Sequence, residues 1–529
     1  MLRVSMYQIS MAVVDPDAVG LEADSFERHL PAFLRDSVPI AELGGLEASS
    51  EGAPTRCPLS LLAMLLLQFR YGLSERELQR RCQRDLGFRY ALGLEGCARP
   101  PSARTLRRFR ERLIAAQGED YVLRLSLRVA SAEGLLGDTA LQAIDSTNTD
   151  CRGAVIDTFN LVAAGIRQVL RAVARSVGVR AAELAKEWAL ERYMARSVKG
   201  AAAIDWSDEK QRNALLTQEI RDADQLVEKV RELHQRVGLP EDIQGAVDLL
   251  VQVAQQDVQR LDDGTYRIAK GTVPGRIISM SDPEARHGRK SASKVIHGFK
   301  THVTGTIDSQ FVTGIAITDA ATHDGQPTPV LIAQTATNGV KPTEIVGDNA
   351  YGAGANIRAS NEVGVQMRTK PSRPAPRGAI SKREFDIDIE QMVITCPADK
   401  TATEYTWVGA KEEAGPVPQF RFASEDCQAC DLRSTCSGAT AKGGRRVIRL
   451  SPYEREHQQN RAFAESPQGQ HVLRARSSIE RLISHLVRMG MRHARFFTMK
   501  RVQLQAFLVA ASYNLQRIFT IRASGATDP

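Results

Sequence analysis

Two short apolar segments each run into an acidic residue, and this pair limits the possible folds more than any other feature of the sequence. Asp145 follows the apolar residues of "LQAIDST" (141–147), and Asp348 ends "TEIVGD" (343–348). Apolar runs of this length predict buried strands. Sheets of α/β proteins bind ligands beyond the carboxyl ends of such strands, where two carboxylates would repel unless a cation lay between them. Each Asp could instead cap a turn or a helix, because its side chain accepts backbone N–H groups.

The pattern of apolar residues around these strands predicts a mixed α/β fold with a long helical insertion. Residues 157–239 contain no proline, and their charges alternate in sign along the expected helix faces. After residue 273 the pattern becomes β-rich, with a hairpin expected around 308–310. The insertion could be a dimerisation arm, a DNA clamp or a spacer. The expected order is an irregular segment (1–57), helices (58–135), the first strand (136–153), the helical insertion (154–265), a strand-rich core (266–370), an irregular Cys-rich insert (371–450), C-terminal helices (451–522) and a tail (523–529).

The charge of the chain favours a polyanionic partner. The net charge is +8, and the segment "PPSARTLRRFRERL" places arginines beside a thin apolar stripe of Leu106, Phe109 and Leu113. Such a helix suits a helix-turn-helix-like DNA contact, although it could equally be a solvated helical surface. No apolar run approaches the ~20 residues of a membrane span, and the start of the chain lacks a signal-peptide pattern, so we expect a soluble intracellular protein. "GATAKGGRR" (438–446) does not fit a phosphate-binding loop, and no nucleotide cofactor is expected.

A third acidic residue lies in a basic helix near the end of the chain. Glu480 is the only acid between Arg474 and Arg501, and it lies beside a stripe of apolar residues at helical spacing. It could simply pair with Arg476 one turn earlier. The many arginines around it have no evident internal partner in the sequence, which indicates that they contact phosphate.

The order of these segments resembles the DDE transposases of bacterial insertion sequences. The blocks "AIDSTN", "SDPEARHGRKSASKVIHGFKTH", "AITDAATHDGQ", "EIVGDNAYG" and "SIERLISHLVRMGMRHARF" are similar to successive motifs of that family, and the helices of 58–113 are similar to its N-terminal domain. The resemblance covers nearly the whole chain apart from the first residues and the helical insertion. It implies a ribonuclease-H-like catalytic core.

The resemblance also implies the site and its chemistry. Asp145, Asp348 and Glu480 become the catalytic triad that holds Mg²⁺ or Mn²⁺, and the enzyme would cleave element ends and join them to target DNA. Double-stranded DNA is the implied partner, and we expect a homo-oligomer on the DNA. The residues expected to contact DNA are Arg104, Arg107, Arg108, Lys300, Arg476, Arg488, Arg492, Arg495, Lys500 and Arg501.

The sequence departs from the family pattern at three places. Arg476 and Glu480 match the Arg and Glu of a Tyr–Arg–Glu–Lys signature, but Leu473 and Val487 replace its Tyr and Lys. Ser146 stands where the family usually has Gly after the first Asp. Because of Leu473 and Val487, the resemblance does not extend to the accessory phosphate contacts of the signature, whereas Ser146 is a mild departure. Two alternatives remain, a metal-dependent nuclease without strand transfer and a catalytically inactive, transposase-derived DNA-binding protein; the presence of all three acids argues against the second.

Four cysteines in the Cys-rich insert have a spacing that suits a structural zinc site. Cys427 and Cys430 form a tight Cys-x-x-Cys pair, with Cys396 before it and Cys436 after it. Reduced cysteines without a ligand and an iron–sulfur cluster are the alternatives. The remaining cysteines, which we expect to be packing residues, are Cys57, Cys82, Cys97 and Cys151.

The segment "ATHDGQ" adds one further acid near the expected core. Asp324 could be an additional metal ligand, but we favour a cap of the helix that begins near Pro327. Lys300 lies between His297 and His302 on an expected strand, where it could contact phosphate. Either histidine could equally be a surface residue.

Overall fold

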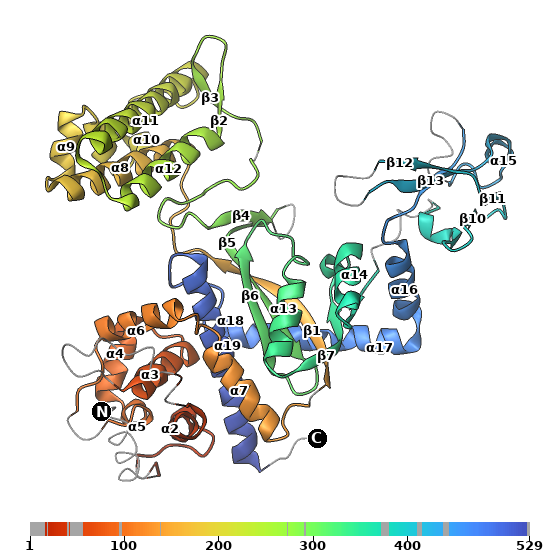
Figure 1. Ribbon diagram of the computed structural model, residues 1–529, viewed down its shortest axis with the longest axis horizontal. Coiled ribbons are helices and arrows are strands. Elements are labelled where there is room, and N and C mark those ends of the chain that lie inside the picture. Colours follow the sequence, from red (N-terminus) through yellow and green to blue (C-terminus); the bar gives the residue numbers. More distant parts are fainter. Residues whose placement is uncertain are drawn as a thin grey trace.

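The computed structural model describes residues 16–17, 19–39, 42, 57–94, 98–137, 139–271, 273–289, 293–371, 380–409, 415–436 and 444–525. It has the mixed α/β architecture expected from the sequence, with a central sheet, N-terminal helices, a helical insertion and a separate Cys-rich part (Figure 1). Within the described residues, no helix is long and apolar enough to cross a membrane.

The central sheet has the strand order β4-β5-β1-β7-β8, and β6 also pairs with β5. Strand β1 runs antiparallel to β5 and parallel to β7. Because side chains alternate along β1, Ala143 packs in the core that includes α18 and α19, whereas Ile144 packs in the core that includes α13 and α14. Helices therefore cover both faces. The elements are β1 (Thr139–Asp150), β4 (Arg286–Arg289), β5 (Val295–Thr306), β6 (Val312–Asp319), α13 (Thr328–Thr337), β7 (Lys341–Gly347), α14 (Gly354–Glu362) and β8 (Gln366–Thr369).

The N-terminal helices pack around the last helix of the chain. The sequence predicted an irregular segment up to residue 57, but a helix, α2, spans Phe26–Ser37. The prediction was wrong because Pro31 hid the apolar spacing of Phe26, Leu30 and Phe33, which form one buried helix face. The rings of Phe26 and Phe33 contact Phe519 of α19 at centroid distances of 5.6 and 6.2 Å. The other helices are α3 (Pro58–Arg70), α4 (Glu75–Arg84), α5 (Leu86–Ala91), α6 (Ala103–Ala115) and α7 (Tyr121–Ala132).

The insertion after β1 is helical, as its sequence pattern predicts, and it has a hydrophobic core of its own. Asp157 begins α8 by accepting the backbone N–H of Asn160, and Gly178 ends it in the left-handed conformation. A short hairpin of β2 and β3, which the sequence did not indicate, closes the insertion before the chain returns to the sheet. The elements are α8 (Thr158–Val177), α9 (Ala181–Glu187), α10 (Val198–Ala201), α11 (Glu209–Val237), α12 (Glu241–Gln256), β2 (Val258–Arg260) and β3 (Tyr266–Ile268).

The Cys-rich part contains two small antiparallel sheets, although the sequence predicted an irregular insert. The prediction was wrong because the strands are very short. They are nevertheless held by a separate apolar core that includes Phe385, Ile394, Phe420 and Phe422. The elements are β9 (Asp386–Asp388), β10 (Val393–Thr395), β11 (Thr401–Ala402), β12 (Tyr405–Val408), β13 (Val417–Arg421), α15 (Ser424–Gln428) and β14 (Val447–Arg449).

The C-terminal helices are interrupted where the sequence predicted one continuous basic helix. Helix α18 ends at Arg488, and Gly490 turns the chain with a φ of 96°. The next residues run along the end of β1, where the N–H of Asp150 donates to the carbonyl of Arg492. Helix α19 begins only at Met499. The helices are α16 (Glu454–Glu465), α17 (Pro467–Ala475), α18 (Ser477–Arg488) and α19 (Met499–Ser524).

Candidate functional site

Asp145 and Asp348 lie opposite each other at the edge where two parallel strands separate. In the register of β1 and β7, Ala143 lies opposite Val346, and two residues further along each chain are Asp145 and Asp348. The sequence predicted that β1 ends at Asp145, but β1 continues to Asp150 because β5 pairs with it over this whole stretch. It is β7 that ends, at Gly347. Asp145 therefore lies where β1 loses one neighbour, which leaves room for Asp348.

The backbone fixes both carboxylates. One oxygen of Asp145 accepts the N–H of Ser146 at 2.7 Å. One oxygen of Asp348 accepts the N–H of Ala350 at 2.8 Å, which caps the short 3-10 helix η3 (Asn349–Tyr351). Asp348 therefore has the capping role that the sequence allowed. The cap fixes the direction of the Asp348 carboxylate and is compatible with a role of that carboxylate in the site. The second oxygen of each carboxylate is not used in these bonds.

Glu480 of helix α18 is linked to Asp145 by an arginine that contacts both carboxylates. The guanidinium of Arg476, just before the helix, donates to Asp145 at 3.3 Å and to Glu480 at 2.7 Å. The Glu480–Arg476 pair expected one turn apart is therefore present, but it also reaches Asp145. Arg476 is mostly buried, with 19% of its side chain exposed, whereas 57% of the Glu480 side chain is exposed.

The electrostatics of Asp145 show that its negative charge is not fully compensated. The pKa of Asp145 is raised to about 6, mainly by burial and also by the charges of Asp348 and Glu480. The N–H of Ser146 and the guanidinium of Arg476 lower the pKa of Asp145 without offsetting the rise. Among the described residues, no three Asp, Glu, His or Cys side chains stand close enough together to hold a metal ion. In this structure Arg476 is thus the cation at the site.

Tyr351, which the sequence reasoning missed, lies in the core beneath the two aspartates. Its side chain is completely buried, and the space that a Cβ at Gly347 would need is filled by the Tyr351 side chain. Burial raises the pKa of Tyr351 well above its usual value, and Asp145, Asp324 and Asp348 raise it further. Its position three residues after Asp348, in "DNAYG", was the available signal.

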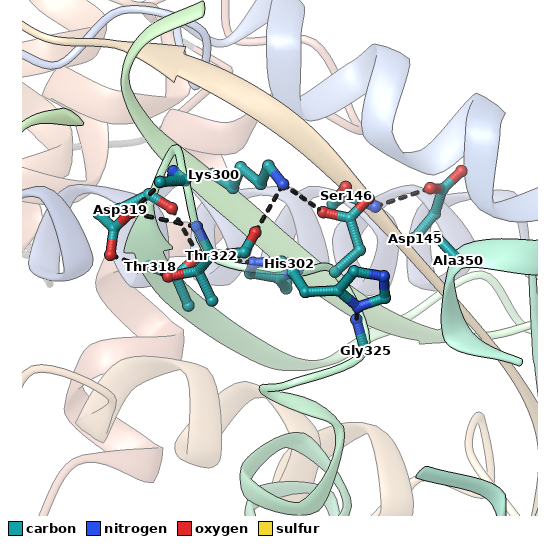
Figure 2. A network of polar contacts seen from close by, with 12 residues as sticks. Asp145, Ser146, Lys300, His302, Thr318, Asp319, Thr322, Gly325 and Ala350 are labelled. Carbon is teal, nitrogen blue, oxygen red and sulfur yellow. Dashed lines mark hydrogen bonds and ion pairs between the residues drawn. The ribbon is translucent and has the colours of Figure 1, made fainter. Parts of the chain in front are cut away.

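A second polar network lies on strands β5 and β6, next to Asp145 and Ser146 (Figure 2). Lys300 pairs with Asp324 at 2.8 Å and donates to the carbonyl of Thr322 at 2.7 Å. The expected cap of α13 by Asp324 is wrong, because Pro327 is at that N-cap and no side chain caps it. His302 is buried and bonded to Thr318, and burial lowers its pKa to about 4, so it is neutral at pH 7.

The four cysteines of the Cys-rich part lie around one small cavity. Cys396, Cys427, Cys430 and Cys436 line a cavity of about 30 Å³ together with aromatic residues of the local core. Burial raises the pKa of the Cys436 thiol, and the other three thiols raise it further. These cysteines form no metal-binding group within the described residues, so the structure does not confirm the zinc prediction. Of the expected packing cysteines, Cys82 is buried, Cys57 and Cys151 are partly buried, and Cys97 lies outside the described residues.

Comparison with known families gives two matches. Residues 395–519 match the family described as "Transposase DDE domain", and residues 20–112 match the "Transposase domain (DUF772)". The two matched segments are similar to domains of insertion-sequence DDE transposases. The first match contains Glu480 and Arg476, whereas Asp145 and Asp348 lie outside both matches. No curated protein matches the chain.

Transposases act on DNA, and the basic residues expected to bind it fall into two groups. The surplus positive charge was expected to have no internal partner, but several of these residues do have one. Arg107 pairs with Glu75, Lys500 with Glu119 and Arg501 with Glu111. Arg495 is more than half buried, donates to the carbonyl of Leu73 and lies over the ring of Phe69. The exposed members without an ion pair among the described residues are Arg104, Arg108, Arg488 and Arg492.

Proposed function

We propose that the protein is a DNA transposase that cleaves phosphodiester bonds at the ends of its element and joins the freed ends to target DNA. The observation that carries this proposal is the register of β1 and β7, which sets Asp145 opposite Asp348, with Glu480 linked to Asp145 through Arg476. The mixed sheet, with the antiparallel strands β5 and β6 beside a parallel pair, is consistent with a ribonuclease-H-like core.

The donor set fits a hard divalent cation such as Mg²⁺ or Mn²⁺. Asp145, Asp348 and Glu480 supply only oxygen ligands, and a cation would stabilise the charged form of Asp145, whose pKa is raised by burial and by the other two carboxylates. When bound there, divalent ions activate the attacking oxygen and stabilise the leaving oxygen of the phosphodiester. The buried core under the two aspartates keeps them in position.

Arg476 has two uses in this scheme. Without a divalent ion its guanidinium balances the carboxylates, and its planar fork also suits a phosphate oxygen of bound DNA. Arg488 and Arg492, which follow Glu480 in the chain and are exposed, would hold the DNA that leads into the site. The strand-transfer step requires two duplexes at one centre, and this is what separates a transposase from a simple nuclease.

The test replaces each acid by its amide. Asp145→Asn, Asp348→Asn and Glu480→Gln should each reduce strand cleavage about a thousandfold or more, because a metal site supplies several kcal/mol of transition-state stabilisation. Binding of element-end DNA should change little. Asp308→Asn, in the exposed turn of the β5–β6 hairpin, is the matched control and should cleave normally. The substrates are the inverted repeats that flank the gene, incubated with magnesium.

The same assay separates the alternatives. Wild-type protein given pre-cleaved element ends and a supercoiled plasmid should produce joined DNA. Normal cleavage without joining at any tested salt concentration would indicate a metal-dependent nuclease. Binding without cleavage or joining would leave a DNA-binding protein derived from a transposase. Normal cleavage by one of the three amide variants would remove that residue from the triad.

The cysteine cluster would hold one Zn²⁺ as a structural ion. Thiolates are the preferred ligands of structural zinc, and all four cysteines line the same small cavity. Elemental analysis should find about one zinc per chain, and replacement of Cys427 and Cys430 by serine should remove it. Cys57→Ser, far from the cavity in sequence, should retain the zinc. Freshly purified wild-type protein without zinc would contradict this assignment.

A further inference from the structure

One face of helix α8 in the helical insertion carries three arginines at the edge of a groove. Arg167, Arg171 and Arg175 are four residues apart, so they lie on the same side of the helix. With Gln168 they line a groove of about 530 Å³ whose opposite side includes Met280 and Ser281. Met280 and Ser281 belong to the segment that leads back into the sheet just before β4. The groove therefore includes residues of the segment that connects the insertion to β4.

The positive charge of this groove is not balanced from within. Helix α8 contains no acidic residue, and among the described residues none of its three arginines forms an ion pair. Other arginines of the insertion do, as Arg180 pairs with Glu183 and Arg231 with Glu228. Arg171 and Arg175 are exposed.

Arg167 has a different role in the groove. It is only partly exposed and donates to the carbonyls of Tyr193 and Ala195, which holds its guanidinium at the floor of the groove. Burial and the charge of Arg171 lower the pKa of Arg167, as expected for neighbouring cations without an anion between them. The groove is thus built to receive negative charge from outside.

The spacing of the arginines suits a nucleic-acid backbone. At a rise of 1.5 Å per residue, the three arginines cover about 12 Å of the helix face. A strand of duplex DNA carries one phosphate per ~3.4 Å of its axis, so about three or four phosphates would lie along that length. Arginine matches phosphate well because its fork can donate two parallel hydrogen bonds. Among the described residues, no aromatic side chain lines the groove, so this part of the chain lacks the anchors typical of a protein interface.

We infer that Arg171 and Arg175 bind backbone phosphates of DNA, which makes the helical insertion a clamp that grips DNA without reading its sequence. This inference rests on the proposed function, since it assumes that DNA is at the neighbouring sheet. It also selects the clamp from the three roles that the sequence allowed for the insertion. Arg167 forms the floor of the groove and is not needed for the test.

The experiment measures how salt weakens DNA binding. Full-length wild type and the double variant Arg171→Ala/Arg175→Ala are titrated onto a fluorescent 30-base-pair duplex of arbitrary sequence at several NaCl concentrations. If both arginines contact phosphate, the slope of log K against log [NaCl] should become shallower by about 1.8, at about 0.9 per contact. The control Arg180→Ala/Arg231→Ala removes the same charge from the insertion, at arginines that are already paired, and should keep the wild-type slope.

A conservative variant and the comparison with the control determine how the salt slopes are interpreted. The variant Arg171→Lys/Arg175→Lys should keep most of the slope, because charge drives counterion release. This variant covers the case in which the alanine variant does not fold. Equal slopes for the groove variant and the control would overturn the clamp. A change of oligomeric state in the groove variant, with an unchanged slope, would instead assign the groove to a protein contact.

If the wild type binds and cleaves DNA while the groove variant matches the control, only this inference fails. If the wild type binds no DNA, the proposed function itself fails.

Discussion

At the scale of single residues, two acids differ in how the protein accommodates their charge. Asp145 is partly buried beside other acids but accepts hydrogen bonds from Ser146 and Arg476. Glu219, on α11 of the helical insertion, is completely buried, and neither of its oxygens has a hydrogen-bond partner among the described residues. Burial raises the pKa of Glu219 to about 8, so this carboxyl is mainly protonated at pH 7.

Glu219 should therefore make the insertion less stable as the pH rises. Below pH 4.5 the carboxyl is protonated in both states and contributes nothing. Between pH 4.5 and about 8 only the unfolded state loses its proton, so the free energy of unfolding falls by up to ~1.4 kcal/mol per pH unit. Above pH 8 the loss is complete. Glu219→Gln should thus melt at the wild-type temperature at pH 5 and clearly above it at pH 8.

Tryptophan fluorescence is a suitable measurement, because Trp188 and Trp206 pack against the core of the insertion. Glu228→Gln, on the exposed side of the same helix, is the control and should show no such pH-dependent gain. An unchanged melting temperature of the Glu219 variant at pH 8 would show that the carboxyl is solvated or paired.

Single residues also show which features of the structure could be predicted from the sequence. Asp145, Asp348 and Glu480 could be proposed from the sequence because each breaks a local pattern: two acids follow short apolar runs, and one stands alone among basic residues. The partner of Arg501 could not be found, because Glu111 lies 390 positions away. Glu219 lies in a segment of alternating charges, and the sequence pattern there does not indicate that this side chain is buried. Contacts between distant segments depend on packing, which local patterns do not contain.

At the scale of elements, the turn between α18 and α19 changes which arginines can reach DNA. Arg488 and Arg492 are exposed on either side of Gly490. Lys500 pairs with Glu119 in the turn between α6 and α7, Arg501 pairs with Glu111 of α6, and Arg495 is packed against Phe69. On a continuous helix Arg488, Arg492 and Arg495 would lie in one row, because they are four and three residues apart. The helical pattern across 474–501 did not indicate the turn, although Gly490 was a possible signal.

This difference predicts unequal effects of two double variants on DNA binding. Arg488→Ala/Arg492→Ala should flatten the salt slope of log K by about two, since each lost phosphate contact removes about 0.9. Lys500→Ala/Arg501→Ala removes the same charge but should have a smaller effect, because Glu119 and Glu111 already neutralise these cations. Joining of pre-cleaved ends should follow the same order. Similar slopes for the two variants would mean that the turn does not separate their roles.

Elements also differ in how well the sequence predicted them. The long helices of the insertion and the β5–β6 hairpin were predicted because their periodicity extends over many residues. Helix α2 was missed because a proline lies within it, and the strands of the Cys-rich part were missed because most have only two to four residues. In such short strands the pairing partner, rather than local propensity, determines the structure.

At the scale of the whole molecule, the apolar cores show which parts depend on one another. One core joins the N-terminal helices, one face of the central sheet and α19. Asn514 of α19 exchanges two hydrogen bonds with the backbone of Val312 on β6, while Phe519 packs against α2. The helical insertion and the Cys-rich part each have a separate core. The N-terminal helices and the sheet should thus unfold together, and the insertion should unfold on its own.

Two core variants and two spectroscopic signals test this division. Phe519→Ala removes a fully buried ring from the shared core and should lower its free energy of unfolding by about 3–5 kcal/mol. All three tryptophans of the chain, Trp188, Trp206 and Trp407, lie outside that core. The variant should therefore lower the melting temperature of one component of the far-ultraviolet circular dichroism, while the tryptophan transition stays at the wild-type temperature.

The reciprocal variant changes the core of the helical insertion. Leu250 is fully buried in the core of the insertion, where it packs closely against Gly165 of α8. Leu250→Ala should lower the free energy of unfolding of the insertion by about 2–5 kcal/mol, so the tryptophan transition should move to lower temperature while the component sensitive to Phe519 stays in place. If both variants shift both signals together, the insertion and the sheet form one cooperative unit. A rigidly coupled insertion would then hold its α8 arginines at a fixed position relative to Asp145, whereas independent unfolding allows the insertion to adjust to the bound DNA.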